Sequence, residues 1–239
     1  MSYADNPYRS PEFTIAGLAP ANERADFIRK TYSHLIAAIF LFVGLEALLL
    51  SLPGIDRLAF MAVQGYGWLI VLGAFMAVSW LAEHWARSAA SPATQYAGLT
   101  LYVVAEAVIF VPLLYFASTF SPDIIPTAGI ATLVVFGGLT AIVLLSGHDF
   151  SYLRTALYLG GFIALGLIVA SILVGFSLGV LFTTAMIALA SGYILYHTSN
   201  VLHHYRLDQH VAASLALFAS VALLFWYIVQ LVMRFTSRD

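Results

Sequence analysis

Two glutamates lie inside long apolar stretches of the sequence, where ionisable side chains are rare. Glu106 lies about eleven residues into one stretch, which is roughly 16 Å along a helix, and Glu46 lies in the last third of another. A charged side chain in hydrocarbon costs about 2.5–3.5 kcal/mol on insertion scales, so such residues usually face protein or water. Both glutamates therefore fit either hydrogen-bonded packing in the protonated form or a path for protons or cations. The sequence leaves these two roles open.

The histidines all fall near the ends of apolar stretches, on one side of the membrane in the predicted topology. Histidine titrates near neutral pH, so this belt indicates either a sensor of acidification or the ordinary tolerance of histidine at a polar interface. His197 is the member that we group with Glu106 and Glu46 as a candidate for ion passage or pH sensing. No metal site is predicted, because no acidic or cysteine pattern completes a standard ligand set. The seven histidines are His34, His84, His148, His197, His203, His204 and His210.

Intramembrane catalysis would require a nucleophile and a base within hydrogen-bonding reach of each other. Ser191 and His197 are six residues apart, which turns them about 120° apart on one helix, so they cannot pair. The sequence has no cysteine, and it lacks metalloprotease and phosphate-loop motifs. We therefore predict that the protein is not an enzyme and carries no cofactor.

The composition indicates what surrounds these residues. Of the 239 residues, 62% are hydrophobic and 9% are charged, whereas a soluble domain carries about 25% charged residues. Too few polar side chains remain to cover a surface that faces water, so the predicted partner of the exterior is a lipid bilayer. The formal net charge of −2 offers no basic surface for nucleic acid.

Seven stretches are long enough to cross a membrane. A hydrocarbon core of roughly 30 Å requires about 20 apolar residues in a helix. The sequence therefore predicts an all-α bundle of seven transmembrane helices, at residues 32–52, 66–84, 95–117, 127–146, 153–174, 177–197 and 211–233.

The lysines and arginines predict the orientation of this bundle. Seven of the ten lie in the N-terminal segment and in loops on the same side, and such an excess marks the cytosolic side. We therefore expect a cytosolic N-terminus and an outer C-terminus. The chain then divides into a free cytosolic tail (1–31), a membrane domain (32–235) and a short outer tail (236–239). Asp149 and Asp208 fall in predicted cytosolic loops.

Four segments, in order along the chain, resemble the bacterial Bax inhibitor-1/YccA family. Arg24-Ala-Asp-Phe-Ile-Arg-Lys-Thr-Tyr32 is similar to the family's segment before the first span, and Asp149-Phe-Ser-Tyr-Leu153 to its Asp-Phe-Ser-Phe-Leu stretch. Ile194-Leu-Tyr-His-Thr-Ser is similar to its Ile-Leu-Tyr-Asp-Thr-Ser segment, and 212–225 to its last span. The resemblance covers the chain from Arg24 onward and implies six helices around a central one.

The family is associated with a pH-sensitive calcium leak that is gated by an aspartate pair on the last two helices. At the two matching positions this chain has His197 and Ser220. A histidine and a serine lack the like-charge repulsion that lets two aspartates share a proton, and calcium prefers several oxygen ligands. The usual aspartate-gated calcium mechanism is therefore not expected here.

The family is also associated with binding and restraint of an FtsH-type AAA protease. The resemblance, together with the missing aspartates, favours a multi-pass protein of the bacterial inner membrane that modulates membrane-protein proteolysis, with the tail as the part that the protease grasps. The alternative is a pH-sensitive leak for protons or for cations such as calcium, with Glu106, Glu46, His197 and Ser220 along the path.

Overall fold

The computed structural model describes residues 14–88 and 91–236, and the elements of this part are helices joined by turns and loops. Among the described residues, Ile15 and Arg206 form an isolated antiparallel β-bridge. The predicted all-α class is confirmed. The helices in chain order are η3 (Ala16–Leu18), α1 (Ala21–Leu50), α2 (Ile55–Val63), α3 (Gly67–Ala86), α4 (Pro92–Phe120), α5 (Ile124–Ser146), η4 (Ser151–Leu153), α6 (Arg154–Val174), α7 (Val180–His203) and α8 (His210–Thr236).

Seven of the described helices are long and apolar enough to cross a bilayer, which confirms the predicted number of spans. They are α1, α3, α4, α5, α6 together with η4, α7 and α8. Their bounds differ from the hydropathy pattern, because a helix continues past the apolar stretch that crosses hydrocarbon. Thus α1 begins at Ala21 instead of residue 32, and α7 continues to His203 instead of ending at residue 197. The short helix α2, between the first two spans, was not predicted.

The ends of several helices follow from local sequence. Ser91 caps α4 by accepting a hydrogen bond from the backbone N–H of Thr94 (3.2 Å), and Pro92 occupies the first turn, where its missing N–H costs nothing. Gly147 and Gly175 follow α5 and α6 in the left-handed conformation, with φ of 63° and 83°. Glycine adopts this conformation without strain, so each residue ends its helix cleanly.

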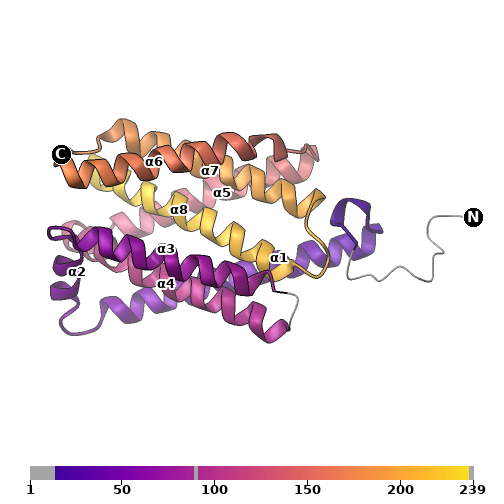
Figure 1. Cartoon of the computed structure of the whole chain (residues 1–239), viewed down its shortest axis with the longest axis horizontal. Helices are drawn as coiled ribbons and strands as arrows, with labels where there is room; N and C mark the ends of the chain where they lie inside the picture. Colours follow the sequence, from indigo (N-terminus) through magenta and orange to yellow (C-terminus); the bar gives the residue numbers. More distant parts are fainter. Residues whose placement is uncertain (1–13, 89–90, 237–239) are drawn as a thin grey trace, which may run out of the picture.

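The last helix of the chain, α8, lies at the centre of the bundle. Figure 1 shows it running between the α3–α4 pair on one side and the α6–α7 pair on the other. It packs against α1, α3, α4, α5 and α7, and it is the most buried of the spans. By contrast, α6 packs mainly against α7, so the outer helices do not enclose α8 evenly. A central helix is therefore present as expected, with one loosely covered side.

Small residues set the closest helix contacts. At Gly98 in α4, an added Cβ would lie 2.5 Å from the carbonyl oxygen of Ala82 and 2.6 Å from the backbone nitrogen of Ala86, both in α3. Gly160 of α6 and Gly192 of α7 lie against leucine side chains across the α6–α7 contact. These glycines let neighbouring backbones approach in a medium that offers little hydrophobic driving force.

The segment before α1 is fastened to the turn between α7 and α8. The backbone N–H of Ala16 donates to the carbonyl of Tyr205 (2.8 Å), and that of Leu207 donates to the carbonyl of Thr14 (3.1 Å). Ala16 is fully buried. Residues 14–30 are therefore folded, and the part of the predicted tail that precedes them, 1–13, lies outside the described residues.

Candidate functional site

A cavity of about 1010 Å³ lies between the α3–α4 pair and the α6–α7 pair, with α8 forming its floor. Its walls are mostly aliphatic and aromatic side chains. The lining extends from Arg87, at the N-terminal end of the bundle where α1 starts, to Arg234 near the opposite end. The cavity thus follows the loosely covered side of α8 along most of its length.

Glu106 lines this cavity near the middle of α4, and its side chain is buried, with 7% exposed. Tyr102 and Phe110 lie one turn before and after it, so the three side chains form a stripe along one face of the helix, and all three line the cavity. Tyr102 thus carries its hydroxyl group on the same face of α4 as the Glu106 carboxyl group. Near the middle of α4, an acidic group and a hydroxyl group thus face a mostly apolar part of the cavity.

The structure brings His197 and Ser220 to the same cavity. The Nδ1 atom of His197 is buried and has no hydrogen-bond partner among the described residues, and its ring stacks on Tyr193, with centroids 6.0 Å apart. The Ser220 hydroxyl donates to the carbonyl oxygen of Ala216 (2.9 Å). His197 and Ser220, which the resemblance led us to compare with a pair of aspartates, therefore share one space with Glu106.

These groups lie at different depths from the N-terminal end. At 1.5 Å per residue, His197 is roughly 9 Å from the end of α7, Ser220 is roughly 15 Å from the start of α8, and Glu106 is roughly 21 Å from the start of α4. Glu83 and Arg87 line the mouth at this end and form an exposed ion pair with a separation of 3.5 Å. Polar groups therefore extend from the mouth to the middle of the bundle.

Glu46 does not line the cavity. It lies on the buried face of α1, which packs against α4 and α8, and 5% of the residue is exposed. Both of its carboxyl oxygens are buried without a hydrogen-bond partner among the described residues. Glu46 is close enough to Glu106 for the two groups to interact electrostatically. The predicted pair is thus near in space, but the two glutamates lie in different surroundings.

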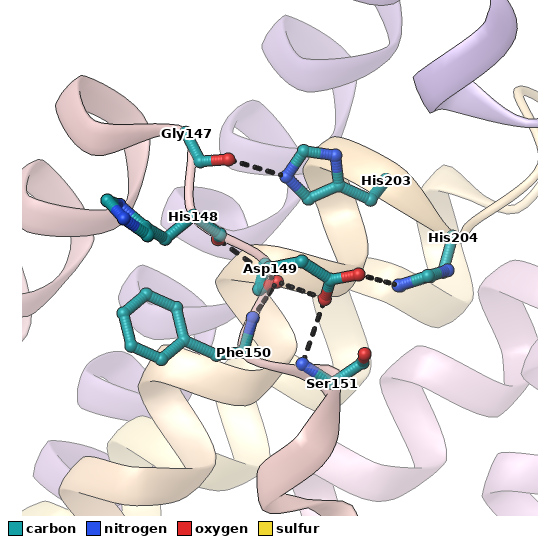
Figure 2. Close-up of polar contacts among 8 residues, drawn as sticks. Gly147, His148, Asp149, Phe150, Ser151, His203 and His204 are labelled. Carbon is teal, nitrogen blue, oxygen red and sulfur yellow. Dashed lines mark hydrogen bonds and ion pairs between the residues drawn. The ribbon is translucent and has the colours of Figure 1, made fainter.

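A second polar cluster joins the loop before η4 to the end of α7, as Figure 2 shows. The Asp149 carboxylate accepts hydrogen bonds from the Ser151 backbone (2.9 Å), the Ser199 hydroxyl (3.2 Å) and His204 Nε2 (2.9 Å). The Ser199 hydroxyl in turn accepts from the backbone N–H of Phe150 (2.8 Å). Through these bonds, the loop that begins α6 is fixed to the C-terminal turn of α7.

In these loops, hydrogen bonds and nearby charges favour the charged forms of Asp149 and Arg206. Partial burial raises the pKa of the Asp149 carboxyl, but the hydrogen bonds from Ser151 and His204 and the charge of His204 outweigh it, so the pKa falls to about 2. Asp208, the other predicted loop aspartate, forms two hydrogen bonds with the guanidinium of Arg206, at 3.0 and 2.6 Å. These bonds raise the pKa of Arg206. Both loop aspartates therefore take part in local ion pairs.

Some residues and contacts of the two sites were not predicted from the sequence. Tyr102 and Phe110 follow from the four-residue spacing around Glu106, and a helical projection could have identified them. Trp226 of α8, which packs edge-to-face on Phe110 (centroids 4.9 Å apart), depends on how two helices meet. Ser199 and Asp149 each lie in a segment that resembles the family, but neither segment indicates that the two side chains meet.

Comparison with known proteins supports the relationship that the motifs suggest. The family described as Inhibitor of apoptosis-promoting Bax1 matches residues 24–237. The chain is 28% identical to Bax inhibitor 1 of Schizosaccharomyces pombe over 225 residues, which cover 90% of this chain and 79% of that protein. It is 26% identical to an uncharacterised protein of Pseudomonas aeruginosa over 222 residues, covering 90% and 92% of the two chains. With seven apolar helices and a family match over most of its length, this chain belongs to the Bax inhibitor-1 family of multi-pass membrane proteins.

Proposed function

We propose that this protein is a pH-sensitive leak for protons, with Glu106 as the central proton-carrying group. The supporting observation is that a single cavity is lined by Glu106, Ser220 and His197 at three successive depths. A carboxyl, a hydroxyl and an imidazole each accept and donate protons. Between the bilayer's polar boundary and its middle, these groups offer a proton successive places to bind.

The chemistry of the lining favours protons over calcium. Calcium takes six to eight oxygen ligands in proteins, several of them from carboxylates or carbonyls. Glu106 is the one carboxyl group among the lining residues away from the mouth, and its polar neighbour on α4 is the hydroxyl of Tyr102. A proton needs one acceptor at a time, so this lining suffices for protons and leaves calcium without a coordination shell.

Proton flux can be measured after reconstitution into liposomes that contain a pH-sensitive dye, with potassium and valinomycin to balance charge. We expect Glu106→Gln to lower the flux at least about tenfold, because an amide neither binds nor releases a proton near neutral pH. Glu46→Gln is the matched control, since it makes the same change at a buried carboxyl outside the cavity, and it should retain most of the flux. No wild-type flux, or equal flux in wild type and Glu106→Gln, would refute the proposal. A calcium-sensitive dye in parallel vesicles should report no calcium entry.

Restraint of a membrane-bound FtsH-type AAA protease is a second proposal, supported by a surface at the N-terminal end. There η3 and the first turns of α1 project beyond the other helices (Figure 1), and they carry exposed charges such as Asp26 and Arg29. Residues 14–18 are held by the α7–α8 turn, so the double variant Asp26→Ala, Arg29→Ala removes the charges from this surface without breaking these contacts. We expect this variant to reduce co-purification with the protease and to alter the turnover of this protein. If neither changes, the proposal fails.

We place the protein in the bacterial inner membrane, with its N-terminus in the cytosol. This placement is supported by the bacterial relative and by the excess of lysine and arginine in segments at the N-terminal end. Under this orientation, His197 and the Asp149 cluster lie towards the cytosol. Cytosolic acidification would then reach the cavity first at His197. Labelling of single cysteines, introduced at an exposed loop on each side of this cysteine-free chain, tests the orientation directly.

A further inference from the structure

The cavity around Glu106 has the size and lining of a binding site for a small organic molecule. Its volume of about 1010 Å³ lies at the upper end of the range of about 300–1,000 Å³ typical of ligand pockets. Such pockets are mostly apolar, with a few polar groups that orient the ligand. Here the polar group at the centre is a single acidic side chain, and the character of that group restricts the ligand.

We propose that this cavity binds a lipophilic organic cation, such as a quaternary phosphonium or ammonium ion with aromatic substituents, whose charge lies beside Glu106. The geometry that supports this is the buried carboxyl group set among aromatic side chains in an apolar cavity. The inference concerns a ligand for the cavity and does not require that protons pass through it.

The carboxyl group explains why the ligand should be a cation. An ionised Glu106 in apolar surroundings is costly unless an opposite charge pairs with it. A small inorganic cation would have to give up its hydration shell for one carboxyl and one hydroxyl group, which is too few oxygens. A large cation with a delocalised charge is weakly hydrated, and its apolar groups gain free energy by leaving water. The site therefore favours a bulky, soft cation.

The aromatic residues near Glu106 add to this preference. Trp226 packs edge-to-face on Phe110, one turn from Glu106, and it stacks on Trp68 of α3, with centroids 5.5 Å apart. All three side chains line the cavity. The faces of aromatic rings attract cations, and the attraction increases when water is excluded. A ligand with aromatic substituents would also gain from packing against these rings.

The test uses tetraphenylphosphonium as the probe and tetraphenylborate as its counterpart of similar shape and opposite charge. The two are titrated separately into the purified full chain in detergent, with binding followed by calorimetry and by quenching of tryptophan fluorescence. We expect saturable binding of the phosphonium at one site per chain, with the borate at least about tenfold weaker. Equal affinities for the two ions would mean simple hydrophobic partition and would overturn the proposal.

Variants locate the site. Glu106→Gln should weaken phosphonium binding at least tenfold, about 1.4 kcal/mol, which is the low end of measured couplings between close charges. Glu46→Gln should leave binding unchanged, because Glu46 is no part of the lining. Unchanged binding in Glu106→Gln, or an equal loss in Glu46→Gln, would overturn the proposal.

A second variant keeps the carboxyl group and fills the space. Ala219 of α8 lines the cavity, and Ala219→Phe should abolish saturable phosphonium binding even if Glu106→Gln does not yield a monodisperse protein. Undiminished binding in Ala219→Phe would place the ligand elsewhere and would overturn the proposal. This test is independent of the proton-leak proposal. A chain that binds phosphonium but passes no protons would support the cation site and refute the leak. A chain that passes protons but binds no phosphonium would support the leak and refute the cation site.

Discussion

The contact between α3 and α4 at Gly98 makes a sharp test of the helix packing, and we expect Gly98→Ala to destabilise the protein. The added methyl carbon would lie 2.5 Å from the Ala82 carbonyl oxygen and 2.6 Å from the Ala86 nitrogen. Ordinary van der Waals contacts of a Cβ atom begin near 3.4 Å. Because both contacts are backbone atoms, no side-chain rotation relieves them, and the two helices must separate by roughly an ångström.

The expected magnitude combines two opposing effects. Overpacking of this kind costs about 1–3 kcal/mol, whereas replacing glycine by alanine within a helix gains about 1 kcal/mol. The net change should therefore be a loss of up to about 2 kcal/mol in the free energy of unfolding. For a chain of this size, a loss of about 2 kcal/mol corresponds to a fall in Tm of roughly 4–8 °C.

A matched control is available at Gly166 in α6, where an added Cβ meets nothing within 4 Å. Gly166→Ala makes the same chemical change without the steric cost, so its Tm should equal or exceed that of the wild type. Thermal unfolding of both variants in one detergent, followed by the loss of monodisperse protein on size-exclusion chromatography, gives the comparison. If Gly98→Ala is as stable as Gly166→Ala, then α3 and α4 are not packed at the distance seen here.

Three further predictions concern the loop cluster, the α6–α7 contact and the residues His197 and Ser220. Asp149→Asn should cost about 1 kcal/mol in the free energy of unfolding. The pKa of Asp149 is about 2, below its ordinary value of 3.8. The difference in Tm between the variant and the wild type should therefore be largest above pH 4 and should vanish as the pH falls towards 2. Tyr193→Phe removes the hydrogen bond from the tyrosine hydroxyl to the Leu157 carbonyl (2.9 Å), and it should lower Tm by roughly 2–4 °C. The double variant His197→Asp, Ser220→Asp places two carboxylates in one cavity, so calcium entry into vesicles should rise above the wild-type level. A Tm gap at Asp149→Asn that does not change with pH, an unchanged Tm in Tyr193→Phe, or unchanged calcium entry in the double variant would each contradict the reasoning.

The membrane spans could be predicted because hydropathy and length determine them directly. The pattern failed where a helix is held by something other than lipid. The first turns of α1 are polar and lie beyond the apolar stretch, and α2 is too short to be recognised by length. The segment that contains Ala16 is fixed by hydrogen bonds to a turn almost two hundred residues later, and no local signal encodes such a contact.

The candidate site, too, could be predicted from the sequence only in part. The depth of Glu106 followed from counting residues, and the family motifs indicated His197 and Ser220, which do share its cavity. The position of Glu46 outside the cavity depends on the rotation of α1 about its axis. Its neighbours on that face, Phe42 and Ala38, are buried too, so the sequence predicts a buried face but does not say which helix covers it.

Because the central helix α8 follows the other six spans in the chain, assembly of this bundle must wait until α8 has been synthesised. Domains form from the N-terminus onward during translation, yet the inner faces of α1, α4, α5 and α7 gain their shared partner only when α8 is inserted. Until then Glu46 and Glu106 have an incomplete set of neighbours in the bilayer. A ribosome that stalls before it has made α8 (His210–Thr236) would therefore leave six spans in the membrane without a core, and such a fragment is a natural substrate for degradation.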